Sequence, residues 1–197
     1  MTQEDLHQTV TRVLVALGGN LPGDAASPEA VIRAAIARIL AGLRPPERLR
    51  QQSHLYQTPC FPAGTGPDFI NAVIDLEMSG SPRAILERLH AIEAEFGRNR
   101  ARRWGARTLD LDLLAFGDAV LPDIATYSFW RDLAETRQKT DAPDALIVPH
   151  PRLQDRAFVL VPLNDVAPDW CHPVSHLTAG DMLARLDPDE IAQIRPL

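Results

Sequence analysis

Residues 97–112 combine arginine and aspartate in a pattern that suits the binding of a polyphosphate and its metal ion. The stretch holds five arginines ahead of two aspartates: Arg98, Arg100, Arg102, Arg103, Arg107, Asp110 and Asp112. Arginine binds phosphate oxygens through paired hydrogen bonds. Two aspartates at positions i and i+2 of a strand point to the same face, where they can hold Mg²⁺. We therefore expect an enzyme that acts on ATP. The alternative is that the two aspartates only form the solvated face of a strand, and the nearby arginines make it less favoured.

The arginines of this stretch are expected to divide between two roles. Arg98 and Arg100 alternate along an extended loop, and Arg107 leads directly into the strand that carries the aspartates, so these three are the predicted phosphate ligands. The other two arginines are interpreted as solvated. Trp104, in the same loop, is interpreted either as a lid that excludes water or as an anchor in the core.

A histidine and an asparagine elsewhere in the chain have side chains suited to ligand binding. His150 lies between two prolines and is predicted either to donate a hydrogen bond to a phosphate or to have a structural role. Asn71 follows Phe69 in a predicted strand and is a candidate for contacting the edge of a planar heterocycle. A zinc site is not expected, because no standard ligand spacing joins Cys60, Cys171, His172 and His176.

The composition argues against several classes of protein. With 197 residues, 45% of them hydrophobic, the chain suits one globular domain with a core. A formal net charge of −6 argues against a general binder of nucleic acids or membrane surfaces. The single lysine, Lys139, is not in a Gly-Lys-Ser/Thr sequence, which excludes a P-loop. The two cysteines do not form a disulfide framework, and the N-terminus has no secretory h-region. No apolar run approaches about 20 residues, the length needed to span a bilayer. Together these features favour a cytoplasmic location.

The elements that must position these residues follow from apolar periodicity and capping signals. Ser27 and Ser81 each precede a proline and an apolar stripe at helical spacing, which predicts helices over residues 28–43 and 82–96. Strands are predicted at residues 13–17, 51–58, 69–77 and 108–116. The order β-α-β-β-α-β predicts a ferredoxin-like α+β fold. Its helices are expected to cover one face of an antiparallel sheet, leaving the other face, or the loops at one end, for ligand.

The rest of the chain is expected to elaborate this unit. Residues 1–11 are polar and predicted to be frayed, whereas residues 12–197 are predicted to form a single catalytic domain, as a monomer. Residues 119–145 are interpreted as an insertion that is helical around residues 128–138. A short helix is predicted in the tail, near Leu183 and Leu186.

Taken in order, these residues resemble the 6-hydroxymethyl-7,8-dihydropterin pyrophosphokinases of folate biosynthesis, over about residues 12–173. Four blocks carry the resemblance: Ala16-Leu17-Gly18-Gly19-Asn20, residues 56–71, residues 97–112 and residues 149–158. The resemblance implies transfer of pyrophosphate from ATP to the hydroxymethyl oxygen of the pterin, which gives AMP and the pterin diphosphate. It also implies small-molecule partners only, with neither nucleic acid nor membrane among them.

The same resemblance implies a role for each candidate residue. Asp110 and Asp112 would hold two Mg²⁺ ions that bridge the ATP phosphates. Arg98 and Arg107 would be the catalytic residues that neutralise the transferred group. The ATP site would add to these arginines Glu93, Arg100, His150 and Arg156. The pterin site would consist of Thr58, Pro59, Phe61, Phe69, Asn71, Trp104 and Phe158, in which Phe69 and Phe158 are the two rings that sandwich the pterin.

The chain departs from the resembled family at four places, and two other hypotheses fit part of its pattern. Gly19 stands where the family often has serine, a change expected to be tolerated, and residues 119–145 are longer than usual. Residues 59–62 are not the most usual form of the pterin loop, and the loop between Arg100 and Arg103 is slightly short. An RNA-binding module would use the arginines on phosphates, but the acidic charge and the lack of an aromatic RNP-type strand count against it. A Mg²⁺-dependent phosphohydrolase using Asp110 and Asp112 would break down ATP without any pterin.

Overall fold

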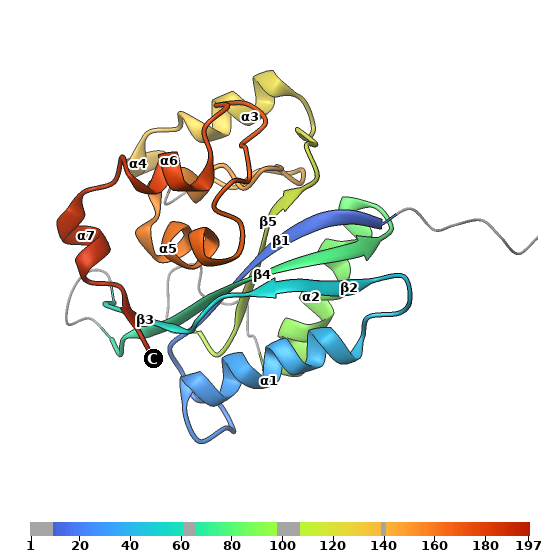
Figure 1. Ribbon diagram of the computed structural model, residues 1–197, viewed down its shortest axis with the longest axis vertical. Helices are drawn as coiled ribbons and strands as arrows, with labels where there is room; N and C mark the ends of the chain where they lie inside the picture. The colour runs from blue at the N-terminus through green and yellow to red at the C-terminus, as the bar shows by residue number, and fades with distance from the viewer. Residues whose placement is uncertain (1–9, 61–65, 98–106, 139–140) are drawn as a thin grey trace, which may run out of the picture.

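The computed structural model describes residues 10–60, 66–97, 107–138 and 141–197. Its centre is a six-stranded sheet in the order β5-β1-β4-β3-β6, with β2 also paired to β4 (Figure 1). The strands are β1 (Val10–Gly19), β2 (Arg48–Gln52), β3 (Tyr56–Thr58), β4 (Phe69–Ser79), β5 (Asp110–Phe116) and β6 (Arg195–Pro196). The pairings are antiparallel, which confirms the predicted α+β class. β1 begins at Val10, slightly before residue 12, where the domain was predicted to start.

The two predicted helices cover one face of the sheet (Figure 1). α1 (Pro28–Ala41) follows Ser27, whose hydroxyl accepts a backbone N–H of the first turn at 3.1 Å. α2 (Pro82–Glu95) follows Ser81, which forms the same contact at 3.2 Å. A serine at this position satisfies one of the N–H groups that the start of a helix leaves without a partner. The apolar stripes of both helices pack with alternate residues of β1, β4 and β5 in the larger buried core.

The opposite face, which was predicted as a place for ligand, is partly covered by helices from the C-terminal part of the chain. α5 (Ala157–Val166) and α6 (Ala179–Leu183) share a second buried core with residues of β1, β4 and β5, and α7 (Pro188–Ala192) lies beyond them (Figure 1). Most residues of α5 are buried, and the helix begins with seven apolar residues, so its sequence has little of the polar face that marks a surface helix. α5 thereby limits the space that this face leaves for ligand.

The strand predicted at residues 51–58 is divided into two. β2 ends before Ser53, whose hydroxyl accepts the Val73 N–H at 2.9 Å and whose own N–H donates to the Val73 carbonyl at 3.0 Å. A serine side chain that bonds to the backbone competes with the ladder of a sheet. β2 and β3 therefore pair with different halves of β4.

Residues 119–145 pack onto the fold through two helices rather than the one predicted. These are α3 (Ile124–Arg131) and α4 (Glu135–Gln138). Asp123 caps α3 by accepting a backbone N–H at 2.8 Å. The fully buried Tyr127 places its hydroxyl 2.9 Å from Nε2 of His172, which connects this segment to the C-terminal part of the chain.

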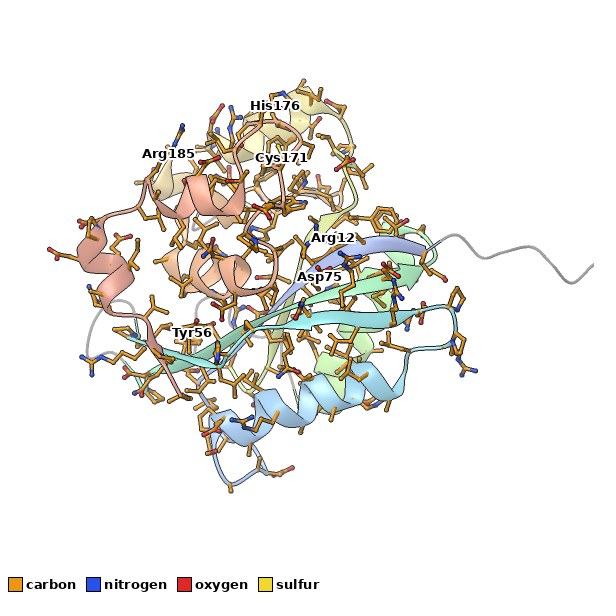
Figure 2. The ribbon with its side chains drawn as sticks, viewed as in Figure 1. Arg12, Tyr56, Asp75, Cys171, His176 and Arg185 are labelled. Carbon is orange, nitrogen blue, oxygen red and sulfur yellow. The ribbon has the colours of Figure 1, made fainter. Side chains whose placement is uncertain are left out.

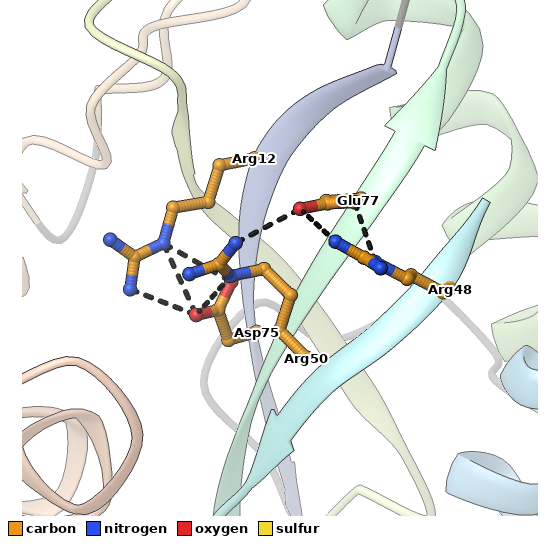
Figure 3. Close-up of polar contacts among 5 residues, drawn as sticks. All are labelled: Arg12, Arg48, Arg50, Asp75 and Glu77. Carbon is orange, nitrogen blue, oxygen red and sulfur yellow. Dashed lines mark hydrogen bonds and ion pairs between the residues drawn. The ribbon is translucent and has the colours of Figure 1, made fainter. Parts of the chain in front are cut away.

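A cluster of ion pairs lies on the sheet at the end distant from Tyr56 (Figures 2 and 3). It consists of Arg12, Arg48, Arg50, Asp75 and Glu77. The Asp75 side chain is 1% exposed and accepts from Arg12 at 2.8 Å and from Arg50 at 3.2 Å. Arg50 also pairs with Glu77 at 2.9 Å. A buried carboxylate requires such partners, because burial without them is costly. The charged groups of this cluster are therefore paired with one another.

Candidate active site

The register of the sheet places the aspartates and several predicted pterin ligands on one face. Asp110 of β5 pairs with Gly18 of β1, and Gly18 pairs in turn with Asn71 of β4. Thr58 of β3 pairs with Phe69, two positions before Asn71. Directly paired residues share a face, and residues along a strand alternate between faces. These side chains therefore point to the face that α5 partly covers, and they form a strip at its end.

Asn71 is held in a defined orientation within this strip. Its Nδ2 donates to Oγ1 of Thr58 at 2.8 Å, and both side chains are buried. Its Oδ1 lies over Gly18, where an added Cβ would approach it to 2.8 Å. Because the amide nitrogen is engaged by Thr58, the amide oxygen is the atom that Asn71 presents over the glycine. Gly18 thus makes room for a hydrogen-bond acceptor.

Two guanidinium groups lie near the two aspartates. Arg107 forms an ion pair with Asp110 through Nη1 and Oδ2. Arg156, at the start of α5, has its pKa lowered by burial, while the carboxylates of Asp112 and Asp110 oppose that shift. Both aspartates are half-buried on the same face of β5. Carboxylates next to guanidinium groups in a partly dry site can bind a cation and a phosphate chain together.

His150 borders this cluster in its neutral form. Its backbone N–H donates to the Leu114 carbonyl at 2.8 Å, and its Nδ1 accepts the Arg152 N–H at 3.1 Å. Burial, with the nearby Arg156 and Arg152, lowers the pKa of the imidazole to about 3. Because Nδ1 accepts a hydrogen bond, the proton of the neutral ring is on Nε2. His150 thus has a structural contact through one nitrogen and an N–H donor at the other.

Glu93 lies below the aspartate strand, in the interior. It is 1% exposed, and its Oε1 accepts the Leu111 N–H at 2.8 Å, between Asp110 and Asp112. This contact fixes the backbone that carries the two carboxylates. Its predicted role as an ATP ligand stays a prediction.

A cavity of about 410 Å³ opens beside Asp112 and has two unlike sides. His150, Arg152 and Arg156 join Asp112 in lining one part of it, and apolar residues that include Trp130 and Leu146 line another. Its volume lies within the range of about 300–1,000 Å³ typical of small-molecule sites. The cavity can therefore take a ligand with a charged part and an apolar part.

Asn20 is a site residue that the sequence did not reveal as such. It is 2% exposed, its Oδ1 accepts the Arg107 N–H at 2.8 Å, and its Nδ2 donates to the Pro67 carbonyl at 3.1 Å. Its own N–H donates to the Arg107 carbonyl at 2.9 Å. The side chain thereby joins the segment before β5 to the segment before β4. The available signal was a polar residue directly after the apolar strand.

Several of the remaining predicted ligands lie outside the described residues. These are Phe61, Arg98, Arg100 and Trp104, and Arg102 and Arg103 lie outside as well. Pro59 is exposed directly after Thr58. Phe158 is 39% exposed in the first turn of α5, and its ring centroid lies 5.6 Å from the guanidinium carbon of Arg156. An exposed aromatic ring beside the strip suits contact with a planar ligand.

The two aspartates of β5 fit a Mg²⁺ ion that is also bound by substrate phosphates and water. Among the described residues there is no cluster of three or more His, Cys, Asp or Glu side chains that could hold a metal ion. Mg²⁺ is commonly bound by one or two carboxylates together with substrate phosphates and water, rather than by an all-protein cage. Asp110 and Asp112 provide such a pair on one face of a strand. They are the residues that would hold the ion.

Comparison with known proteins decides the family. The family model described as 7,8-dihydro-6-hydroxymethylpterin-pyrophosphokinase (HPPK) matches residues 14–168, which is more than half of the chain. The chain belongs to the HPPK family. A 2-amino-4-hydroxy-6-hydroxymethyldihydropteridine pyrophosphokinase of Pseudomonas aeruginosa is 42% identical over 161 residues, 81% of this chain and 83% of the relative. One of Synechocystis is 34% identical over 192 residues, 98% of this chain and 85% of the relative.

A solved structure agrees with this fold. A crystal structure of Plasmodium falciparum HPPK-DHPS, with pterin and p-hydroxybenzoate, superposes with a TM-score of 0.64 at 14% identity. The alignment covers 91% of this chain and 44% of that one, so the chain spans less than half of the length of that protein. At such identity the likeness shows the shared HPPK fold alone. Together with the family match it confirms the resemblance stated from the sequence, and the chain is a pyrophosphokinase of folate biosynthesis.

Proposed function

We propose that the strip from Phe69 to Asp112 is where this HPPK family member transfers pyrophosphate from ATP to 6-hydroxymethyl-7,8-dihydropterin. The observation that carries the proposal is the register Asn71–Gly18–Asp110 across three strands. It puts the Asn71 amide and the Asp110 carboxylate, which would hold the metal ion, in one row on one face. A transfer reaction needs its two substrates next to each other in a fixed geometry.

The phosphate half of this site consists of Asp110, Asp112, Arg107, Arg156 and His150. Arg107 and Arg156 neutralise negative charge on the phosphates, and His150 donates through Nε2. Mg²⁺, when bound by Asp110 and Asp112, supplies further neutralisation of the triphosphate charge. Two ions are proposed, as the sequence suggested. Arg98 and Arg100 are proposed to complete this half as phosphate ligands.

The pterin half consists of Asn71 with its partner Thr58, and of aromatic rings at Phe69 and Phe158. Asn71 Oδ1 is free of Thr58 and accepts an N–H from the edge of the heterocycle. Phe158, exposed next to Arg156, offers a ring face to the pterin. Pro59, Phe61 and Trp104 are proposed to close the same half.

In the proposed reaction the hydroxymethyl oxygen of the pterin attacks the β-phosphorus of ATP. The new O–P bond forms as the bond from the β-phosphorus to the oxygen of the α-phosphate breaks, AMP leaves, and the hydroxyl proton is released to water. Phosphoryl-type transfer depends on positioning and charge neutralisation more than on a strong base. The described part of the site provides those two functions through its arginines, its carboxylates and Asn71.

A kinetic separation of the two halves tests this assignment. Asn71→Ala is expected to raise KM for the pterin about tenfold, the effect of one hydrogen bond to substrate, with KM for ATP unchanged. Gln57→Ala is the matched control, because Gln57 is an amide on the paired strand that faces the opposite way and bonds to Asp68 at 2.8 Å. An Asn71→Ala variant with normal KM for the pterin would contradict the placement of the pterin here.

The cytoplasm and a monomeric state are proposed for the chain. Neither cysteine forms a disulfide in the described part of the structure. Within the described residues no helix combines the length and apolar character needed to cross a bilayer. Sedimentation analysis of the purified chain tests the monomer, which a dimer at micromolar concentration would contradict.

A further inference from the structure

The cavity beside Asp112 contains an aromatic wall that comes from the 119–145 segment. Trp130 of α3 lines this cavity, as do Pro143 and Ala145 farther along the same segment. Leu113 and Leu146 continue the apolar lining. Asp112, His150 and the arginines at 152 and 156 line the same cavity. The cavity thus has charged groups at the aspartate strand and a mainly apolar part that includes Trp130, with the Asp141 carboxylate also in its lining.

Trp130 is presented to the cavity by a helix with defined anchors. α3 is capped by Asp123 at 2.8 Å and fixed through the buried Tyr127, whose hydroxyl is 2.9 Å from His172. Trp130 is half-buried, whereas the preceding Phe129 is 51% exposed and does not line the cavity. The Phe129 and Trp130 rings are nearly perpendicular, with centroids 5.5 Å apart and planes at 86°. Trp130, unlike Phe129, lines the cavity, where its indole can meet a planar ligand.

We propose that Trp130 binds the purine base of ATP by stacking, and so makes α3 a part of the nucleotide site. The inference rests on the proposed function, which places the phosphates at Asp112 and Arg156. With the phosphates there, the base of the same nucleotide extends into the apolar part of the cavity. Stacking on an aromatic side chain tolerates any base, because every base has a π-face. Trp130 therefore contributes affinity for a nucleoside triphosphate without selecting adenine over guanine.

A pair of substitutions separates stacking from apolar packing. Trp130→Leu keeps an apolar side chain but removes the aromatic face, and Trp130→Phe keeps a smaller aromatic face. Trp130→Leu is expected to weaken ATP binding about tenfold, and Trp130→Phe by no more than about threefold. Phe129→Leu is the matched control on the same helix, and it is expected to leave ATP affinity unchanged.

The measurement is calorimetric titration of the full chain with ATP and, separately, with inorganic triphosphate, both in the presence of Mg²⁺. Because triphosphate has no base, Trp130→Leu is expected to bind it as the wild type does. Equal ATP affinity of Trp130→Leu and wild type would overturn the inference and leave the proposed function intact. Equal losses for ATP and triphosphate would also overturn it, since they would indicate a general disturbance of the site. A wild type that binds neither compound would overturn the proposed function itself.

Discussion

Replacing Asn20 by alanine is expected to destabilise the fold and to slow catalysis. The change removes two side-chain contacts, the Arg107 N–H to Oδ1 at 2.8 Å and Nδ2 to the Pro67 carbonyl at 3.1 Å. Asn20 is 2% exposed, so both backbone groups would lose their partner in a nearly dry environment. An unsatisfied buried group costs about 1–3 kcal/mol, so two such groups give a total loss of about 2–6 kcal/mol in the free energy of unfolding.

The assay is urea unfolding followed by far-UV circular dichroism, together with steady-state kinetics at saturating ATP and pterin. Because Asn20 positions Arg107, the variant that remains folded should have kcat reduced at least tenfold. Gln57→Ala removes an exposed side-chain contact of 2.8 Å to Asp68 and is the control, with an expected loss below about 1 kcal/mol. An Asn20→Ala protein that matches the control in stability and the wild type in kcat would refute the reasoning.

Three other substitutions test separate parts of the account. Asp112→Asn should abolish turnover with the thermal midpoint preserved, since it removes a metal ligand at a half-buried position; a variant with normal turnover would argue against the metal assignment. Gly18→Ala should raise KM for the pterin several-fold, because its Cβ would lie 2.8 Å from Asn71 Oδ1, and an unchanged KM would contradict this. Burial lowers the pKa of His172 to about 4, so the unfolded chain, near 6.5, takes up the proton first. Stability is then full above about pH 6.5 and falls as the pH drops toward 4; urea midpoints across this range should vary less in His172→Gln, and an equal slope would exclude His172 as the cause.

Local signals in the sequence predicted the elements that carry the site. Ser27 and Ser81 cap the two helices at the predicted residues, because a serine hydroxyl satisfies a helix start wherever the chain places one. The alternation of apolar and acidic residues in β5 predicted that Asp110 and Asp112 share a face. The order of strands and helices then gave the ferredoxin-like topology, which the sheet confirms.

The parts that escaped prediction depend on tertiary contacts. α5 packs most of its residues into the second core, and its first seven residues are all apolar, so its sequence shows no clear polar face. Ser53 divides a strand through its bonds to Val73, a residue 20 positions away. Asn20 could not be recognised because its partner Pro67 is 47 positions away. Trp130 could not be recognised because the cavity that it lines is formed by distant segments.

Glycine at position 19, where the resembled family often has serine, suits a close approach of two backbone segments. A Cβ at Gly19 would lie 2.3 Å from the carbonyl oxygen of Thr108, a backbone atom just before the aspartate strand. In the backbone of this chain, a side chain at that position therefore requires a shift of the segment that leads to Asp110.

The most direct test of the central claim is a product assay with ATP, Mg²⁺ and 6-hydroxymethyl-7,8-dihydropterin, in which AMP and ADP are separated by chromatography. The account predicts that AMP forms only when the pterin is present, in equal amount to the pterin diphosphate. ADP as the nucleotide product, or breakdown of ATP without pterin, would contradict it and favour a simple kinase or a phosphohydrolase on the same scaffold.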